Sequence, residues 1–456
     1  MFKKSLLIFV VFIPFILHFL TIFQGSLMVF SVVEFARRTP IYVPDNFSSI
    51  QEAINNAPIY SMIIVRKGNY FENIKLNKKV TLVSEGGPRS TKITYLDSGK
   101  PVVEILSDDA NLSGFTLVGN PAMRAVIVAK AENITISNNV IINGTDGVDL
   151  IDSRRSSVRN NLIFNNRLSG IFLIDSHENS IESNIVENNS EGIILAYSSY
   201  NKIKNNTINN NYRYGVLLEM SNKNFLSKNL ISGNKRNFGV YGVLIENFMN
   251  FLELDNEINN KNVVYLVGKE NLTILENAGF VGLINSTNIL VKDLNLSNNF
   301  QSLLIVFSSN IVVTNLTISN NWYGVYIANS NNVTIFLNDF VNNTINIYSC
   351  NSTVSLRSKN EVSYEYKGKI YSSYVGNYWS DYSTNDTIGG IGKKPYVELY
   401  VKDDYPLVSS HYEYKILGAS KYKVNLIVIG VFLIFVVLFV FILLKKKESE
   451  FKLISI

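Results

Sequence analysis

Aromatic side chains recur in the turn before a repeated glycine phrase, where they could stack against sugar rings. Phe300 and Trp322 are 22 residues apart, and Tyr323 follows Trp322. Tyr212 and Tyr214 stand in the same kind of turn earlier in the chain. If the chain winds back every 22 residues, Phe300 and Trp322 lie on adjacent turns, about four turns from the two earlier tyrosines. These five residues are therefore candidates for carbohydrate binding; the alternative is that they pack against the loop that follows.

A second set of residues could act in acid and base catalysis. Asp146, Asp149 and Asp152 are spaced three residues apart and are followed by Arg154. Because paired carboxylates cleave glycosidic bonds, these four are the catalytic candidates. The matching places one period later hold only one acid, at Ser169, Phe172 and Asp175. An ordinary solvated turn explains the same residues, and we expect binding rather than catalysis.

Both candidates depend on a repeat of 22 or 23 residues. A phrase of glycine and branched apolar residues begins at Gly147, Gly170, Gly192, Gly215, Gly242 and Gly324. Asparagines keep the same interval at Asn139, Asn161, Asn184, Asn206 and Asn229. Periods of this size are typical of stacked coils.

Each repeat contains short runs of Ile, Val and Leu separated by Asn, Ser and Gly, and no run is long enough for a core helix. Three short strands per repeat close one turn of a solenoid, in which every strand pairs in parallel with its counterpart one period away. The sequence therefore predicts an all-β fold, a right-handed single-stranded parallel β-helix of about a dozen turns. Equivalent asparagines would lie ~4.8 Å apart and hydrogen-bond in a ladder.

One position of each glycine phrase should point outward, because side chains alternate along a strand. This places Phe172, Ile194, Leu217 and Leu244 in line after Asp149. An exposed apolar stripe usually has a cover. We expect a loop, the segment 234–238 or a second subunit to lie over it.

A short helix should cover the first coil, whose apolar cross-section would otherwise be exposed. Ser49 and Glu52 match a capping box, and Ile50, Ala53 and Ile54 share one helical face. The sequence predicts a helix over residues 49–56.

Both ends of the chain carry membrane signals. Two lysines precede an apolar run over residues 5–23, which indicates an export signal or an N-terminal anchor. Residues 426–444 are apolar without a charge, long enough to span a membrane as a helix, and three lysines follow. Since basic clusters stay in the cytoplasm, we expect a single-pass membrane protein with its body on the extracellular side.

Composition agrees with an exported protein that does not bind nucleic acid. The net charge is +5 for 456 residues, and no Lys/Arg stripe with interleaved aromatics appears. Cys350 is the single cysteine, so no disulfide can form within the chain. Glycosylation sequons, of which we expect only the outward ones to be used, occur at Asn46, Asn111, Asn133, Asn143, Asn188, Asn205, Asn271, Asn285, Asn295, Asn315, Asn332, Asn342, Asn351 and Asn385.

Several segments resemble a known family. Residues 42–45, 49–54 and 65–70 resemble the start of pectin-lyase-like β-helix proteins. The closing motif Gly-Asn-Tyr-Trp-Ser-Asp-Tyr at residues 376–382 looks like that of the NosD group, which includes many archaeal surface proteins. The resemblance covers about residues 40–410 and implies membership of a class of carbohydrate-binding proteins and sugar hydrolases.

The resemblance also implies metals that this chain is poorly equipped to bind. Where the family usually has an acidic stretch, Asp386 remains but lysines follow at residues 393–394, which leaves Asp386 as a lone candidate for an oxygen-based metal site. A copper role in maturing nitrous oxide reductase would need soft or imidazole ligands. The three histidines, His18, His177 and His411, are scattered. We expect no metal and no cofactor.

The expected organisation follows from these features. The parts are a signal or anchor (1–33), the capping helix and opening coils (40–120), the repeats (121–355), a closing segment (356–412), a transmembrane helix (425–444) and a basic tail (445–456). We expect binding or scaffolding of surface polysaccharide or glycans, with a homo-oligomer or a surface-layer protein as a possible partner. The alternatives are a polysaccharide lyase or glycoside hydrolase, and a copper accessory protein.

Overall fold

The structure, a computed structural model, describes residues 39–122, 124–275, 277–399 and 401–419. The described residues from Ile41 onward belong to one compact unit. The predicted export segment and the predicted C-terminal span lie outside the described residues. Within the described ranges, no helix is both long and apolar enough to cross a membrane.

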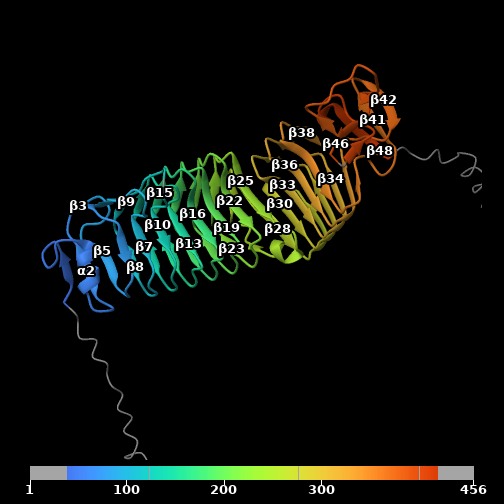
Figure 1. The fold of residues 1–456 in the computed structure, drawn as a ribbon. Helices are drawn as coiled ribbons and strands as arrows, with labels where there is room; N and C mark the ends of the chain where they lie inside the picture. The colour runs from blue at the N-terminus through green and yellow to red at the C-terminus, as the bar shows by residue number, and fades with distance from the viewer. Residues whose placement is uncertain (1–38, 123, 276, 400, 420–456) are drawn as a thin grey trace, which may run out of the picture. The chain divides into compact units, whose positions relative to one another are not determined.

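Three strands make one turn of a parallel β-solenoid, as β14, β15 and β16 do, and equivalent strands of successive turns stack into three sheets (Figure 1). Sheet A consists of β1 (Ile41–Val43), β2 (Met62–Val65), β5 (Thr81–Ser84), β8 (Asn111–Ser113), β11 (Thr135–Ser137), β14 (Ser157–Arg159), β17 (Ser180–Glu182), β20 (Lys202–Lys204), β23 (Phe225–Ser227) and β26 (Phe251–Leu252). Sheet C consists of β4 (Ile74–Leu76), β7 (Val103–Ile105), β10 (Ile127–Ala129), β13 (Val148–Ile151), β16 (Ser169–Ile174), β19 (Glu191–Ala196), β22 (Tyr214–Glu219) and β25 (Arg236–Tyr241).

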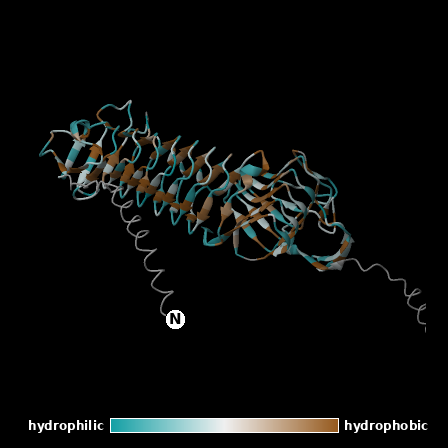
Figure 2. Ribbon diagram, turned by 90° about the horizontal axis from the view of Figure 1, so that it is seen from below, coloured by the Kyte–Doolittle hydropathy of each residue, from teal (hydrophilic) through white to brown (hydrophobic). Residues whose placement is uncertain are grey.

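Sheet B is the longest, with 14 strands. Its members are β3 (Gly68–Phe71), β6 (Thr91–Thr94), β9 (Thr116–Val118), β12 (Val140–Ile142), β15 (Leu162–Phe164), β18 (Ile185–Glu187), β21 (Thr207–Asn209), β24 (Leu230–Ser232), β27 (Glu257–Ile258), β28 (Lys261–Val267), β30 (Ala278–Ile284), β33 (Gln301–Val306), β36 (Tyr323–Ala328) and β39 (Ile345–Cys350). Hydrophobic strands repeat along the stack with hydrophilic turns between them, as Figure 2 shows. The predicted all-β parallel solenoid is confirmed.

The predicted asparagine ladder is present. Asn184 Oδ1 accepts both the backbone N–H and the side-chain amide of Asn161, each at 3.0 Å, and Asn206 does the same for Asn184. The other amide bond of Asn184 goes to the Val158 carbonyl at 2.8 Å. Buried amides with every partner supplied hold adjacent turns in register.

The repeated glycines are needed because adjacent turns come too close for a side chain. A Cβ at Gly192 would lie 2.3 Å from the carbonyl oxygen of Gly215, one turn further on. Only glycine permits this approach of two backbones.

The capping helix is α2 (Ile50–Asn56), which buries Ile50, Ala53 and Ile54 as predicted. The Ser49 side chain accepts the Glu52 N–H at 3.1 Å. Glu52 reaches back to Ser48 rather than to Ser49, at 3.1 Å for the backbone N–H and 2.8 Å for the hydroxyl.

The repeat is interrupted after β25, which the 22-residue interval did not predict. The phrase at Gly242 does not form the expected strand; it leads into the 3-10 helix η1 (Ile245–Phe248), and β27 then pairs with β28 in antiparallel fashion. We call residues 41–258 the first solenoid and residues 261–355 the second solenoid. The strand of the second solenoid that contains the glycine phrase, β36, continues sheet B instead of sheet C.

The second solenoid packs against the end of the first. In β30 and β33 every residue is buried. Phe280 and Leu304 belong to the core of the first solenoid, while Val281 and Leu303 belong to the core of the second. One sheet thus closes two hydrophobic cores at once.

Two further sheets complete the second solenoid. A five-stranded sheet contains β29 (Glu270–Ile274), β31 (Thr287–Lys292), β34 (Ser309–Thr314), β37 (Asn331–Phe336) and β40 (Val354–Ser355). A four-stranded sheet contains β32 (Asn295–Ser297), β35 (Thr317–Ser319), β38 (Asp339–Val341) and β43 (Tyr378–Trp379).

The closing motif covers the end of the second solenoid. Trp379 is fully buried between the rings of Phe340 and Tyr396, at centroid distances of 4.5 and 4.2 Å. The remaining elements are β41 (Val362–Tyr366), β42 (Lys369–Ser373), β44 (Thr387–Ile388), β45 (Ile391–Gly392), β46 (Tyr396–Glu398), β47 (Val401–Asp403), the 3-10 helix η2 (His411–Glu413) and β48 (Tyr414–Ala419).

Candidate functional site

Four of the five aromatic candidates meet where the two solenoids join. The ring of Phe300 lies 5.8 Å from that of Tyr214 and 5.5 Å from that of Tyr323, both edge to face. The guanidinium of Arg236 lies 4.4 Å from the ring centroid of Trp322 and 5.6 Å from that of Tyr214. We call Tyr214, Arg236, Phe300, Trp322 and Tyr323 the junction cluster.

The interruption of the repeat produces this contact. Tyr214 and Arg236 are partners in register on β22 and β25, the last two strands of sheet C. The backbone N–H of Phe300 donates to the Phe238 carbonyl at 2.9 Å, which joins the second solenoid to the edge of β25. The expected separation of about four turns between Tyr214 and Phe300 is therefore wrong, since the stacking restarts beside β25.

Phe300 also ends the outward row of sheet C. Asp149, Phe172, Ile194 and Leu217 are aligned by strand pairing, as predicted. The next place belongs to Gly239, where a Cβ would lie 2.6 Å from Phe300 Cβ.

The expectation that Leu244 continues this row is wrong, because Leu244 follows β25 and is 62% exposed. Segment 234–238 is not a cover either, since part of it forms β25 itself. The second solenoid covers the end of the row instead, through Phe300.

Positive charge surrounds Tyr214. The guanidinium of Arg213 lies 5.2 Å from its ring centroid, and Arg236 lies on the next strand. Burial lowers the pKa of Arg236, and the Tyr214 phenol opposes that change. Arginine beside aromatic rings supplies N–H donors next to stacking faces.

The sequence analysis missed Tyr326 and Tyr348, which extend the cluster along β36 and β39. The Tyr326 ring lies 5.5 Å from that of Tyr323 and stacks on that of Tyr348 at 5.0 Å. Burial raises the pKa of Tyr326. Their separation of 22 residues, the same as that of Phe300 and Trp322, was the available signal.

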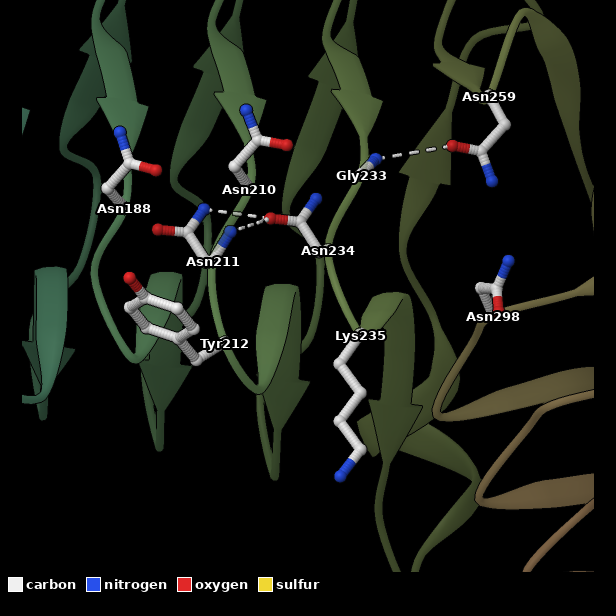
Figure 3. Close-up of a pocket in the computed structure, with 9 residues that line it drawn as sticks. All are labelled: Asn188, Asn210, Asn211, Tyr212, Gly233, Asn234, Lys235, Asn259 and Asn298. Carbon is white, nitrogen blue, oxygen red and sulfur yellow. Dashed lines mark hydrogen bonds between the residues drawn. The ribbon is translucent and has the colours of Figure 1, made fainter.

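Tyr212 makes no ring contact with the junction cluster within the described residues and lines a groove of about 480 Å³ that is formed mainly by asparagine amides (Figure 3). Tyr212 is 70% exposed there. Asn234 Oδ1 accepts the backbone N–H and the side-chain amide of Asn211, each at 2.9 Å. Asn298, from the second solenoid, also lines this amide groove and precedes Phe300 by two residues.

Two of the catalytic candidates come together on sheet C, and a third acid joins them. Asp146 accepts the Ser169 N–H at 2.8 Å, and the Ser169 hydroxyl donates to Glu191 at 3.2 Å. Burial, together with the charge of Asp146, raises the pKa of Asp149 to about 8. Burial also raises the pKa of Asp146 and the pKa of Glu191. The positive charge of Arg213, 2.9 Å from Glu191, opposes the rise in the pKa of Glu191.

Glu191 could have been found from the sequence. Glu191 directly precedes Gly192, just as Asp146 directly precedes Gly147 two repeats earlier. Our prediction considered only the repeat that follows Asp146, where Ser169 stands at this place. The other two candidates do not join the carboxylates. Asp152 is exposed in a turn with φ of 53°, and Arg154 is exposed beyond it.

The described residues include no group of three or more His, Cys, Asp or Glu side chains that could hold a metal ion. Asp386 is exposed and pairs with Lys393 at 2.7 Å. His177 accepts the Ser199 N–H at 3.1 Å, and His411 is buried 3.0 Å from Asp339. Separate histidines with these partners do not fit a copper centre, which needs several soft or imidazole ligands together.

Three solved structures are similar to this chain at low sequence identity. A mannuronan C-5 epimerase A-module of Azotobacter vinelandii is 17% identical over 70% of this chain and 97% of its own, with a TM-score of 0.38. A GH87 α-1,3-glucanase of Streptomyces thermodiastaticus is 15% identical over 70% of this chain and 66% of its own, with a TM-score of 0.43. Pectate lyase Pel9A is 10% identical over 69% of this chain and 77% of its own, with a TM-score of 0.37.

Among curated proteins, a cell surface glycoprotein of Methanothermus fervidus is 35% identical over 99 residues. The match spans 21% of this chain and only 16% of the glycoprotein. The family described as periplasmic copper-binding protein (NosD) matches residues 72–273 and 227–384, which include most of the first solenoid, the second solenoid and the closing motif. The chain therefore belongs to the NosD family.

Proposed function

We propose that this protein is displayed at the cell surface and binds glycan chains at the junction cluster. The observation that carries the proposal is the contact of Tyr214, from the first solenoid, with Phe300, from the second. Arg236 adds a guanidinium between Tyr214 and Trp322. Aromatic faces for sugar rings and N–H donors for hydroxyl groups thus stand side by side.

The amide groove beside the cluster would extend the binding surface. Asn188, Asn210 and Asn298 line it from both solenoids, together with Tyr212 and Lys235. Amides offer a donor and an acceptor each, which suits the mixed donor and acceptor pattern of sugar hydroxyls. A chain of several sugar units could therefore follow the line from Tyr212 to Trp322.

Surface display is supported by the relative from Methanothermus fervidus, a cell surface glycoprotein. The apolar residues 5–23 would direct export, and residues 426–444 would anchor the chain with its body outside. Exposed sequons such as Asn205 and Asn342 would carry glycans. A second copy or a surface-layer protein would be the protein partner.

A glycan array, followed by titration of the best ligand, tests binding. Trp322→Ala should lower the affinity about tenfold, because one stacking face and the ring under Arg236 are lost. Phe71→Ala is the matched control, since Phe71 is 62% exposed on β3, outside the junction cluster. Equal affinities of wild type and Trp322→Ala would refute the proposal.

A second candidate function is cleavage of the bound glycan. It is favoured by the carboxyl of Asp149, whose raised pKa of about 8 keeps it protonated at neutral pH and able to donate a proton. Glu191, which pairs with Arg213 at 2.9 Å, would be the base. Incubation with the glycan found on the array should then release reducing or unsaturated ends, and Asp149→Asn should abolish the release.

A further inference from the structure

A large basic cavity opens on the first turns of sheet C, at the opposite end of that sheet from the junction cluster. Its volume is about 740 Å³. Four cationic side chains line it: Lys75, Lys100, Arg124 and Lys130. We call it the basic cavity.

Three separate parts of the chain build its walls. The Gln51 side chain, on α2, accepts the Lys75 N–H at 2.7 Å and donates to the Lys75 carbonyl at 3.3 Å, which joins the capping helix to the edge strand β4. Asn73 holds the loop of residues 96–101 through the Asp97 N–H at 2.7 Å and the Pro101 carbonyl at 2.8 Å. Val128, on β10, contributes to the floor.

The cations of the basic cavity outnumber the carboxylates that face them. Lys75 pairs weakly with Glu104 at 3.8 Å, and Lys100 pairs with Asp97 at 3.0 Å. Among the described residues, the Arg124 side chain donates to the Gly99 carbonyl at 3.2 Å and makes no ion pair. Lys130 makes no ion pair within the described part of the chain, so an incoming anion would meet unneutralised charge.

We infer that the basic cavity binds a sugar unit that carries an oxyanion, namely a carboxylate, sulfate or phosphate. Arg124 and Lys130 supply the charge, and a guanidinium can hold an oxyanion through two parallel hydrogen bonds. The cavity is far larger than a free inorganic ion, and the amides of Asn55 and Asn77 line it as partners for hydroxyl groups.

The location of the cavity supports a polymer rather than a single sugar. Lys75, Glu104, Val128 and Asp149 are aligned by strand pairing, so the cavity begins the same outward row of sheet C that Phe300 ends. The inference rests on the proposed function in taking the ligand to be a glycan, and it adds that the glycan is anionic.

Titration with paired polymers tests the inference. The probes are polygalacturonate against its methyl ester, and dextran sulfate against dextran, each at low and high salt. The variant Lys100→Gln, Arg124→Gln, Lys130→Gln should bind both polyanions about tenfold more weakly at low salt. Its affinity for the neutral polymers should not change.

The control is Lys202→Gln, Lys204→Gln, Lys228→Gln, which removes the same charge from exposed positions on and beside sheet A. It should bind the polyanions as the wild type does. If both triple variants lose the same affinity for the polyanions, the effect comes from overall charge and the inference is overturned. An unchanged affinity of the cavity variant would also overturn it.

The two proposals can fail separately. If the cavity variant alone loses polyanion binding while Trp322→Ala binds every polymer normally, the basic cavity stands and the junction cluster falls. If Trp322→Ala loses binding while the cavity variant does not, the inference fails alone. Inorganic phosphate that competes fully with dextran sulfate at millimolar concentration would show a simple ion site and contradict the sugar unit.

Discussion

Asp149 carries a carboxyl group whose ionisation is opposed by its surroundings. Its pKa is raised to about 8 by burial and by the neighbouring charge of Asp146. Its Oδ1 atom is buried without a hydrogen-bond partner in the described structure. Since the ordinary value is about 3.9, the folded protein holds this proton more tightly than the unfolded chain. The resulting stability is complete below about pH 4 and is lost as the pH rises through about 8.

Asp149→Asn should remove this pH dependence. The wild type should lose thermal stability relative to the variant as the pH rises from about 4 to 9, because only the wild type must ionise a buried carboxyl. The measurement is the difference in melting temperature across that range. Asp152→Asn, which alters an exposed carboxylate nearby, is the control. A difference for Asp149→Asn that stays constant with pH would contradict the assignment.

At the scale of elements, the asparagine ladder should stabilise the stacking of turns. Asn184→Ala would leave the amide and N–H of Asn161 without their acceptor and the Val158 carbonyl without its donor. Each unsatisfied buried group costs about 1–3 kcal/mol. We expect a loss of roughly 3 kcal/mol in the free energy of unfolding, measured by denaturant titration. Asn209→Ala, on the outer surface of β21, should change it by less than about 0.5 kcal/mol.

The ladder and the glycine phrases were predictable because a fixed interval in the sequence becomes a fixed contact between neighbouring turns. The interruption was not, since periodicity shows which residues point inward but not which sheet a strand joins. One signal was present. A strand buried on both faces reads as a continuous apolar run, as residues 303–306 of β33 do.

At the scale of the whole molecule, the closing motif is held by one buried acid. Asp403 accepts the Asn377 N–H at 2.8 Å, the Trp379 indole N–H at 3.1 Å and the Tyr405 N–H at 2.9 Å. A Cβ at Gly376 would lie 2.1 Å from this carboxylate. The family motif therefore has a structural role, because it closes the end of the second solenoid.

Asp403→Asn should loosen this closure, because the amide replaces one acceptor oxygen with a donor. Removing these hydrogen bonds should cost about 1–3 kcal/mol. Hydrogen exchange should become faster in residues 376–407, while the first solenoid keeps its protection. Asp404→Asn alters an exposed neighbour that pairs with Lys402 at 2.6 Å, and it should leave exchange unchanged. Uniformly faster exchange across both solenoids would contradict a local role.

The candidate site was predictable residue by residue but not as an assembly. The aromatic residues were recognisable by type and spacing, yet their meeting depends on the restart of the stack beside β25, which brings Phe300 to Tyr214. Arg236 was not distinguishable from other surface arginines, because its role comes from strand pairing with Tyr214. The basic cavity likewise needs the loop of residues 96–101 in place.

The most direct test of the junction cluster is a double-mutant cycle on glycan affinity with Tyr214→Ala, Trp322→Ala and the double variant. If both rings serve one site, each single variant should bind the wild-type protein's best array ligand about tenfold more weakly. The double variant should lose less than the product of the two effects. Unchanged affinity in either single variant would show that the rings from the two solenoids do not share a ligand.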